Sequence, residues 1–262
     1  MHTLPLWPWI TYGPVRSRRL GRSLGLNILP PTYKLCSFNC VYCQYGKTTV
    51  CTMNGDNSLA DLPTLNDFEK DLESALREND EIDNITFSGN GEAALHPQFA
   101  EFVDIAKRLK EKYFPEANLS ILSNSSAVSE EKVRRALSKL DFRIMKLDAG
   151  DPETLKRINR PCKEVEYQTI VDGLKSLDGV TLQAMFVDGP MQNIGEREVR
   201  MWVERVDEIK PIKVQIYSLD RPPAESSLQQ VPAEKLREIA ARTKEATGVD
   251  VEVFTTASRH GK

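Results

Sequence analysis

Strand-like and helix-like segments alternate along this chain. Short runs of β-branched and aliphatic residues are each followed by a longer charged segment whose apolar residues recur every three or four positions. This pattern predicts repeated strand–helix units and therefore a parallel sheet with right-handed crossovers. We expect strands at residues 24–29, 84–88, 118–123, 143–148, 181–187 and 213–217, with 249–254 as a candidate edge strand. We expect helices at residues 65–77, 97–112, 130–140, 152–158, 167–177, 196–209 and 232–247, with Ser129 as the N-cap of the third.

No internal repeat or Gly/Ser-rich linker divides the chain, and 262 residues is a typical length for a single α/β barrel. We therefore expect one domain over residues 1–262. Its parts are an N-terminal extension (1–23), a long loop that carries cysteines (30–64) and a C-terminal helix with the candidate edge strand (222–262). Six strand–helix units lie either as an open sheet or as a curled, partial barrel, and periodicity alone does not choose between these.

Polar or small residues follow each expected strand from the second onward. They are Ser88, Gly89, Asn90, Gly91 and Glu92, then Ser123 and Asn124, then Asp148, then Asp188 and Gly189, and then Ser218, Asp220 and Arg221. In barrels and open α/β sheets alike, ligands bind at the carboxyl ends of the strands. We therefore expect these side chains to face one cavity.

Three of the five cysteines lie close together in the pattern C-x3-C-x2-C: Cys36, Cys40 and Cys43. An odd number of cysteines, grouped in this way, suits a metal or cluster site in a reducing compartment better than a disulfide framework. Thiolates are soft ligands, and three of them in one loop can hold three irons of a cubane cluster. The fourth iron is then left open for a substrate or cofactor, like the open position of a catalytic zinc site.

Two other interpretations of the cysteine loop stay open at this point. A structural zinc site would need a fourth ligand, for which Cys51 or His96 is the candidate, although no second C-x2-C or histidine pair follows. A cluster that only transfers electrons is the other interpretation. Cys51 and Cys162 themselves are either ordinary loop cysteines or functional groups.

The cysteine motif, with the aromatic Tyr42 directly before its last cysteine, resembles that of the radical S-adenosylmethionine (radical SAM) superfamily. The resemblance implies an α/β fold, a partial (β/α)6 TIM-like barrel. It also implies a [4Fe–4S] cluster on the three cysteines, with S-adenosylmethionine bound to the open iron. In that family the reduced cluster splits S-adenosylmethionine, and the resulting 5′-deoxyadenosyl radical abstracts hydrogen from a substrate. An external electron donor of the flavodoxin or ferredoxin type is implied as well.

The resemblance extends to polar residues after the second, third and fourth strands. The stretch after the second strand looks like the family's Gly-Gly-Glu motif with an Asn in the second place: Gly89, Asn90, Gly91 and Glu92. It implies that Glu92 holds the amino group of S-adenosylmethionine. Asn124 and Asp148 stand where the family places its ribose and carboxylate contacts. Simpler roles are open too: Tyr42 would only pack beneath the loop, and Asp148 would cap the helix that follows it.

Residues 12–25, 146–151 and 158–161 resemble a narrower branch of the family. They are similar to stand-alone Fe–S oxidoreductases related to the radical SAM domain of the wybutosine-pathway enzyme 4-demethylwyosine synthase. This resemblance implies an oxidoreductase or tailoring enzyme that acts on a small molecule or an RNA base. One alternative is an activase for a glycyl-radical enzyme, which has a protein partner, although Lys146 precedes Asp148 here where an activase would have Asp-x-Lys. A non-catalytic zinc-binding module is the second alternative.

The 35 basic and 38 acidic side chains give a net charge of −3, which argues against a protein that grips nucleic acid mainly through its phosphates. Bulk nucleic-acid binding is therefore not expected. A basic run at residues 16–22 would bind an anionic substrate or pair with acids at the amino end of the barrel. The substrate candidates are one arginine of this run and three residues after later strands: Arg22, Asp188, Asp220 and Arg221.

No apolar segment approaches the roughly 18 residues of a membrane span. No signal peptide is recognisable at the N-terminus. We therefore expect a cytoplasmic protein that does not cross a membrane.

Overall fold

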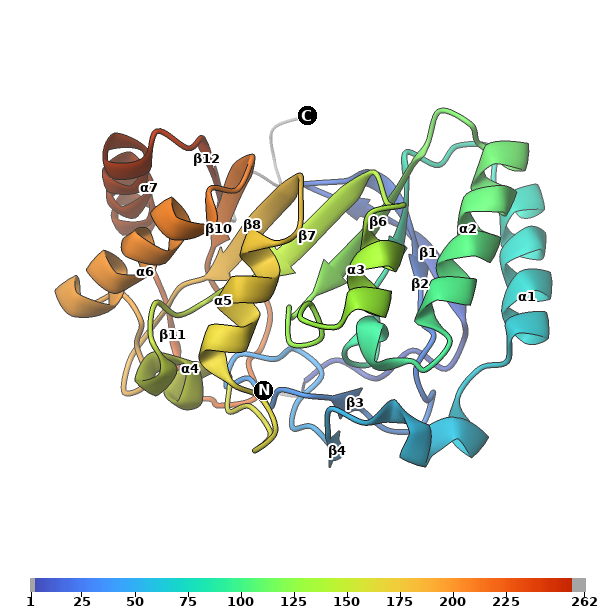
Figure 1. Ribbon diagram of the computed structural model, residues 1–262, viewed down its shortest axis with the longest axis horizontal. Helices are drawn as coiled ribbons and strands as arrows, with labels where there is room; N and C mark the ends of the chain where they lie inside the picture. Colours follow the sequence, from blue (N-terminus) through green and yellow to red (C-terminus); the bar gives the residue numbers. More distant parts are fainter. Residues whose placement is uncertain (1–2, 256–262) are drawn as a thin grey trace.

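In the described part of the chain, eight strands form one sheet (Figure 1). The structure is a computed structural model that describes residues 3–255, apart from the side chains of 57–59. The outer ends of the expected N-terminal and C-terminal parts, residues 1–2 and 256–262, lie outside the described residues. The strands, in their order across the sheet, are β1 Thr11–Ser17, β2 Gly21–Leu26, β5 Asn84–Phe87, β6 Asn118–Ser123, β7 Phe142–Lys146, β8 Val180–Met185, β10 Lys213–Tyr217 and β12 Val251–Phe254. From β2 to β12 all neighbours are parallel, and β1 is antiparallel to β2.

The main helices form one layer along the outer face of this sheet (Figure 1). Within this layer α1 contacts α2, α2 contacts α3, α5 contacts α6 and α6 contacts α7. Their bounds are α1 Leu65–Glu78, α2 Phe99–Tyr113, α3 Glu131–Leu137, α4 Pro152–Ile158, α5 Tyr167–Lys175, α6 Glu196–Ile209 and α7 Ala233–Thr247. The arrangement follows from the sequence alternation, because each helix after a strand must return the chain to the start of the next parallel strand.

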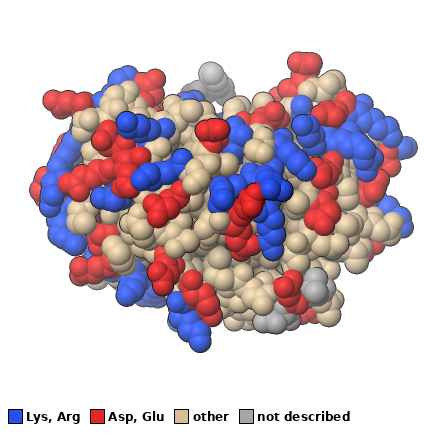
Figure 2. Space-filling view, viewed as in Figure 1, with Lys and Arg blue, Asp and Glu red and all other residues tan. Residues whose placement is uncertain are grey.

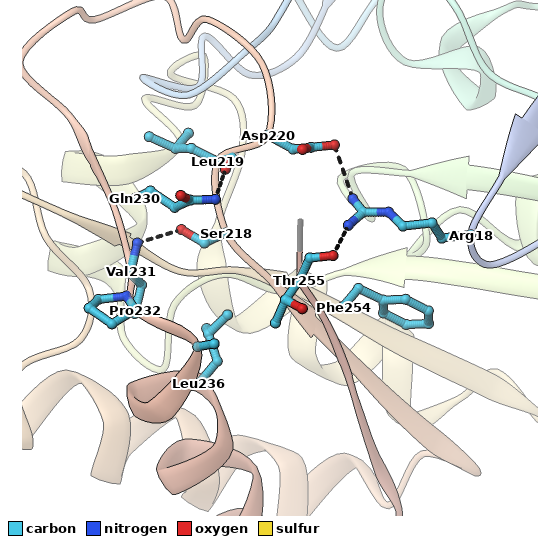
Figure 3. Close-up of a pocket in the computed structure, with 11 residues that line it drawn as sticks. Arg18, Ser218, Leu219, Asp220, Gln230, Val231, Pro232, Leu236, Phe254 and Thr255 are labelled. Carbon is cyan, nitrogen blue, oxygen red and sulfur yellow. Dashed lines mark hydrogen bonds and ion pairs between the residues drawn. The ribbon is translucent and has the colours of Figure 1, made fainter. Parts of the chain in front are cut away.

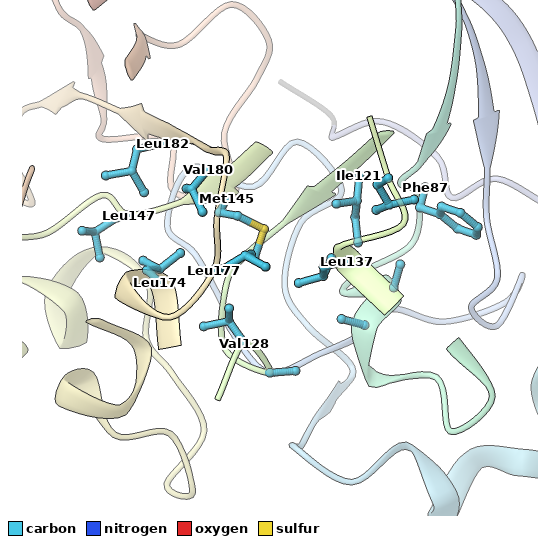
Figure 4. Packing of buried hydrophobic residues seen from close by; sticks show 14 of the residues in the cluster. Phe87, Ile121, Val128, Leu137, Met145, Leu147, Leu174, Leu177, Val180 and Leu182 are labelled. Atoms are coloured by element: carbon cyan, nitrogen blue, oxygen red, sulfur yellow. The ribbon is translucent and has the colours of Figure 1, made fainter. Parts of the chain in front are cut away.

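The hydrophobic core lies between the sheet and these helices (Figure 4). Phe87 and Ile121 point outward from β5 and β6, and they meet the same cluster as Leu137 of α3 and Leu174 of α5. All four side chains are buried. Since successive side chains of a strand point to opposite faces, the residues between these apolar ones must face the inside of the sheet.

The inner face of the sheet is polar. Ser23 Oγ is hydrogen-bonded to Thr86 Oγ1 (2.7 Å), which contacts Ser120 Oγ (3.1 Å), so a row of hydroxyls crosses β2, β5 and β6. A second row crosses β8, β10 and β12, in which Gln215 accepts from Gln183 (3.4 Å) and donates to Glu252 (3.2 Å). A buried polar row of this kind has to be hydrogen-bonded to be tolerated, and here its members bond to one another.

The sheet curls so that a side chain from one edge reaches the chain at the other edge. The turn between β1 and β2 lies at one edge, and its Arg18 guanidinium donates to Thr255 O (2.5 Å), directly after β12 at the other edge. Arg18 Nη2 also lies 3.1 Å from Asp220 Oδ2, in the segment after β10. The neighbouring Arg19 guanidinium sits over the ring of Tyr217, 4.8 Å from its centroid. The predicted α/β partial barrel is therefore confirmed.

Short elements gather in the long connections after β2, β5, β8 and β10. They are β3 Leu35–Cys36, β4 Val50–Cys51, the 3-10 helices η1 Gly55–Asp61 and η2 Ala93–Leu95, and the pair β9 Val187–Asp188 with β11 Gln229–Gln230. None of them belongs to the main sheet. In Figure 1, β3 and β4 lie below the helix layer, at the bottom of the view.

The sequence predicted most elements but placed three details wrongly. The first parallel strand is β2, three residues before the expected 24–29, and residues 11–17 are a strand of the sheet rather than an extension. The register of β1 shifts between Tyr12 and Val15, which hides the two-residue period.

Helix α3 begins at Glu131 with no side-chain cap, because Ser129 belongs to a turn in which its carbonyl and that of Val128 accept from Arg134. The candidate edge strand is present as β12 and makes a seventh parallel strand.

The helices of residues 3–255 include none that is long and apolar enough to cross a membrane.

Candidate functional site

The three cysteines of the motif lie around one buried cation. Lys34 Nζ donates to Cys43 Sγ (3.0 Å) and to the carbonyl of Gly46 (3.0 Å). Burial disfavours the charged form of Lys34, but the nearby Cys43, Cys36 and Cys40 outweigh burial and raise the pKa of its ammonium group. Lys34 is therefore hydrogen-bonded to Cys43 and also favours the charged form of the Cys36 thiol.

Each of the other two thiols also has N–H donors. Cys36 Sγ accepts from Asn124 Nδ2 (3.4 Å), and Cys40 Sγ accepts from Asn159 Nδ2 (3.4 Å). Burial is nevertheless the larger effect: it raises the pKa of Cys36, and it raises the pKa of Cys40 to about 11. Metal ligation requires the thiolate, so further positive charge must arrive with the group that these sulfurs bind.

The glycine-rich stretch after β5 holds the cysteine loop by its backbone. Leu35 N donates to Asn90 O (3.2 Å), and Glu92 N donates to Leu35 O (3.1 Å). The approach is so close that a Cβ on Gly91 would lie 1.7 Å from the carbonyl oxygen of Leu35. Gly91 also has φ of +148°, which favours glycine. Gly91 is therefore required for the fold of the site, whether or not it contacts a cofactor.

Glu92 is buried and ties the end of β5 to the end of β6. Its Oε1 accepts from Ala94 N (3.1 Å) and from Ser123 Oγ (2.9 Å), and its Oε2 accepts from Asn124 N (2.5 Å). Burial outweighs these bonds and raises the pKa of the carboxyl group. Of the roughly four acceptor positions of a carboxylate, three are already used by the protein. The predicted contact of Glu92 with an amino group stays a prediction.

Asn90 serves the N-terminal segment instead of the thiols. Its Oδ1 accepts from Trp7 N (2.8 Å), and its Nδ2 donates to the carbonyls of Trp7 (2.8 Å) and Pro30 (2.9 Å). Trp7 in turn stacks on Tyr12, with ring centroids 4.1 Å apart. The side chain of Asn90 is thus occupied by backbone groups, and its predicted contact with a cofactor stays a prediction.

Asp148 organises the opposite side of the site. The Tyr42 hydroxyl and Asn159 Nδ2 (2.7 Å) both donate to its Oδ2, and Met185 N donates to its Oδ1 (2.7 Å). Asp148 does not cap the helix after β7, because Asp151 does so by accepting from the amides of Glu153 and Thr154. The hydroxyl of Tyr42 is therefore anchored while its ring packs in a small buried cluster.

Lys146 lies next to this group on the inner face of the sheet. Its Nζ donates to Tyr217 Oη (2.7 Å) and lies 3.7 Å from Asp148 Oδ1. The same ammonium group is 5.0 Å from the ring centroids of Tyr42 and Tyr217. An ammonium group has three donors. Lys146 therefore keeps donor capacity for a ligand inside the curled sheet.

The donor set fits a cluster better than a lone ion. In residues 3–255, no three His, Cys, Asp or Glu side chains are placed to hold a single metal ion. Tetrahedral zinc, with Zn–S of about 2.3 Å, needs its sulfurs within ~4 Å of one another. A cluster that gives each thiol its own iron has no such requirement. In addition, Asn159 Oδ1 is buried without a hydrogen-bond partner, which leaves an acceptor for a cofactor beside Cys40.

The four substrate candidates are not brought together. Arg22 lies at the amino end of β2, where it pairs with Glu81 and with Asp83 (3.1 Å), away from the cysteine loop. Asp188 accepts from the amide of Gly189 (2.7 Å) and so closes its own turn. Asp220 pairs with Arg18 beside a cavity of about 240 Å³ at the start of α7 (Figure 3). Arg221, the next residue, is exposed.

Comparison with known families decides the class of this site. The profile of the radical SAM superfamily matches residues 31–203, more than half of the chain and all three cysteines of the motif. The chain belongs to the radical SAM superfamily. A UPF0026 protein of Synechocystis sp. is 34% identical over 216 residues, which are 80% of this chain and 76% of the relative. A UPF0026 protein of Methanocaldococcus jannaschii is 30% identical over 245 residues, 91% of this chain and 72% of the relative.

A third relative is much longer than this radical SAM protein. The protein named GTPase Obg of Brachyspira hyodysenteriae is 30% identical over 252 residues, or 95% of this chain. The chain spans only 35% of that relative.

Solved structures show the same fold. Archaeal TYW1 has a TM-score of 0.61 at 12% identity, covering 91% of this chain and 77% of the other. A structure of TYW1 with a lysine-pyruvate adduct bound has a TM-score of 0.53 at 16% identity, with 86% and 73% covered. SuiB of Streptococcus suis bound to S-adenosylmethionine has a TM-score of 0.63 at 13% identity, with 89% and 51% covered. At these identities the likeness concerns the radical SAM fold alone.

Sequence reasoning missed three residues of this radical SAM site: Lys34, Asn159 and Lys146. Two of them lie in stretches that had already carried the resemblance, 146–151 and 158–161, but only their neighbours were assigned roles. A signal for Asn159 was present, because it directly follows the last residue of α4. This helix comes after β7 and ends at the carboxyl side of that strand. Lys34 had no such signal, because the pattern of a single lysine before a cysteine is common.

Proposed function

We propose that this radical SAM protein cleaves S-adenosylmethionine reductively at a [4Fe–4S] cluster held by Cys36, Cys40 and Cys43. The observation that carries the proposal is the thiol set itself: three sulfurs of one loop around Lys34, with no arrangement for a single ion in the described residues. When bound, the cluster and S-adenosylmethionine would supply the 5′-deoxyadenosyl radical that abstracts hydrogen from a substrate. An external flavodoxin or ferredoxin would supply the electron.

The protein's own residues hold the site rigid. Asp148 fixes the hydroxyl of Tyr42, the residue before Cys43, and the amide of Asn159, which donates to Cys40. On the other side Glu92 fixes the backbone of Asn124, whose side chain donates to Cys36. All of these groups except Cys40, Cys43 and Asn124, which are half-buried, are buried. Such preorganised polar contacts keep the positions of ligands within narrow limits.

We assign the substrate to the polar inner face of the sheet. Lys146 and Arg19 approach the ring of Tyr217 from β7 and from the β1–β2 turn. Among the described residues no carboxylate forms an ion pair with Arg19, whereas Arg18 beside it pairs with Asp220. Two cations around one tyrosine favour a substrate, either a small molecule or an RNA base, that carries an anionic group nearby.

The surface argues for few contacts to a nucleic-acid backbone. On the face seen in Figure 2, basic and acidic side chains are intermixed. Many of them are paired, for example Arg108 with Glu69 (2.7 Å) and Lys139 with Asp104 (2.5 Å). A phosphate-binding surface would instead gather unpaired basic groups. We therefore propose that any RNA substrate is bound through the modified base and a short segment around it.

The test is the chemistry of the anaerobically purified protein. We expect a brown protein that contains iron and sulfide and forms 5′-deoxyadenosine from S-adenosylmethionine under strong reductant. Cys40→Ala should abolish both colour and cleavage. Cys162→Ser is the matched control, because Cys162 lies outside the thiol set, and it should retain both.

Two results would contradict the proposal. One is a full cluster and full cleavage in Cys40→Ala. The other is a wild-type protein that binds one zinc per chain and forms no 5′-deoxyadenosine, which would support the zinc-binding module instead.

A further inference from the structure

Cys51 and Cys162 share one hydrogen-bond acceptor. The Cys51 thiol donates to the carbonyl of Ser37 (3.6 Å), and the backbone amide of Cys162 donates to the same oxygen (2.8 Å). Cys51 is on β4 and exposed, whereas Cys162 follows α4 and is half-buried. Two cysteines from segments far apart in the sequence are therefore held against the residue that follows Cys36.

The shared oxygen places the Cys51 sulfur beside the backbone of Cys162. The neighbouring Cys162 favours the charged form of the Cys51 thiol, but burial is the larger effect and raises the pKa of Cys51, as it does that of Cys162. Glu164, an exposed residue of the loop that carries Cys162, raises the pKa of Cys162 further. Both cysteines are free thiols. No third metal ligand joins them in the described residues, so the pair is not arranged as a metal site.

We propose that Cys51 and Cys162 form a thiol-exchange site, separate from the three cluster cysteines, that closes to an intramolecular disulfide on reaction with low-molecular-weight disulfides. The proposal goes beyond the function of the cluster and does not depend on it. Exposure makes Cys51 the attacking residue, and its half-buried neighbour Cys162 resolves the intermediate.

The reaction balances without any group beyond the small disulfide. The Cys51 sulfur attacks one sulfur of the disulfide, forms a mixed disulfide and releases the first small thiolate. The Cys162 sulfur then attacks Cys51, forms the internal disulfide and releases the second thiolate. The two cysteines lose two electrons and two protons in all. The small disulfide gains the electrons, and the protons of the two cysteine thiols pass through solvent to the two released thiolates.

Closure would tie two segments that surround the cluster loop. β4 pairs with β3, which carries Cys36, and Cys162 lies three residues after Asn159, whose amide donates to Cys40. A bond between Cys51 and Cys162 would therefore fix the loop across Ser37 from both sides. The small disulfide would also be reduced at the exposed Cys51 before it could react with the buried Cys36.

The experiment treats the anaerobically reconstituted protein with oxidised glutathione and maps its peptides without reduction. We expect a cross-linked peptide pair containing Cys51 and Cys162, with the chain lighter by two hydrogens and without a bound glutathione. Cys162→Ser should stop at the mixed disulfide and keep glutathione on Cys51. Cys51→Ser should leave Cys162 unmodified, because the attacking thiol is missing.

Three outcomes would overturn the inference: stable glutathione on Cys51 of the wild type, a cross-link between Cys51 and Cys36, or no reaction of Cys51 at all. Iron content and S-adenosylmethionine cleavage are measured on the same samples. A protein that cleaves S-adenosylmethionine but forms no 51–162 cross-link refutes only this inference. A protein that forms the cross-link but has no cleavage activity refutes only the proposed function.

Discussion

The two sides of the site differ in how completely their polar groups are used. On the β5–β6 side, defined by Glu92, Ser123 and Asn124, the carboxylate accepts three hydrogen bonds and the neighbouring amides and hydroxyls are paired. On the β7–β10 side, defined by Lys146, Asp148, Asn159 and Tyr217, one buried acceptor has no partner and one ammonium group has spare donors. Polar groups that a protein leaves unsatisfied near a cleft are the ones that a ligand can pair with.

This difference assigns separate tasks to the two sides. The β5–β6 side locks the cysteine loop onto the sheet, so its substitutions should act mainly on stability and cluster assembly. We expect the β7–β10 side to meet the ligands, so its substitutions should act on binding and cleavage beyond their effect on stability. Each of the following predictions either breaks or sharpens this contrast.

Gly91→Ala should have the largest effect. Its Cβ would lie 1.7 Å from the carbonyl oxygen of Leu35, and the residue has φ of +148°. Since the obstacle is backbone, we expect a loss of about 3–5 kcal/mol in unfolding free energy and no bound iron. Gly248→Ala is the control, because Gly248 has φ of +73° but nothing within 4 Å of the added Cβ. It should cost about 1–2 kcal/mol and leave iron binding intact. Urea unfolding measures the loss of stability in the two variants, and iron analysis measures their iron content. Equal losses of stability would show that the contact with the Leu35 carbonyl is not the cause.

Asp148→Asn tests the β7–β10 side. The amide has the same shape as the carboxylate but is uncharged. The carboxylate accepts hydrogen bonds from Tyr42, Asn159 and Met185. Hydrogen bonds to charged groups contribute about 1.5–3 kcal/mol, so we expect a comparable loss of stability. We also expect more than a tenfold loss in S-adenosylmethionine cleavage. Asp151→Asn, a change at a helix N-cap where Asn is equally favoured, should keep both near the wild type. Full cleavage activity in Asp148→Asn would show that the β7–β10 side is structural too.

The sequence predicted those features of the site that depend on local sequence, and it missed those that depend on contacts between distant residues. The cysteine spacing and the strand–helix alternation are local patterns, so they predicted the thiol set and the parallel sheet directly, whereas the partial barrel was implied by the family resemblance. The partner of Asn90 is Trp7, 83 residues earlier, and the contact of Arg18 with the carbonyl of Thr255 joins the two edges of the sheet. Those pairings appear only when the sheet curls. The ion pairs of Arg22 with Glu81 and Asp83 at the amino end of β2 likewise appear only in the folded sheet.

Acid sensitivity should come from His96, the residue directly after η2, which packs on Phe102 outside the two sides of the site. Burial lowers the pKa of His96 to about 4, below its ordinary value of 6.5. Between these two values the unfolded chain takes up a proton that the folded chain does not, so stability falls as the pH drops from about 6.5 to 4. At pH 4.5 the expected loss is about 2 kcal/mol relative to pH 7. His96→Gln keeps an acceptor for the amide of Gln98 and cannot titrate. Urea midpoints at the two pH values should therefore differ less in this variant; an equal pH dependence would exclude His96 as the cause.

The smallest effect should come from the spare donors of Lys146. If an anionic group of the substrate binds between Lys146 and Arg19, inorganic phosphate as a simple probe should stabilise the folded protein. At ten times its dissociation constant, phosphate would add about 1.4 kcal/mol. Lys146→Met keeps the apolar stem between Tyr42 and Tyr217 but lacks the charge, and the phosphate-dependent rise in melting temperature should disappear. Arg22→Met removes a cation at the other end of the sheet, where Glu81 and Asp83 already pair with it, and the rise should persist. If phosphate stabilises Lys146→Met as much as the wild type, or stabilises none of the proteins, the anion does not bind at Lys146, and the unused donors there serve the fold rather than the substrate.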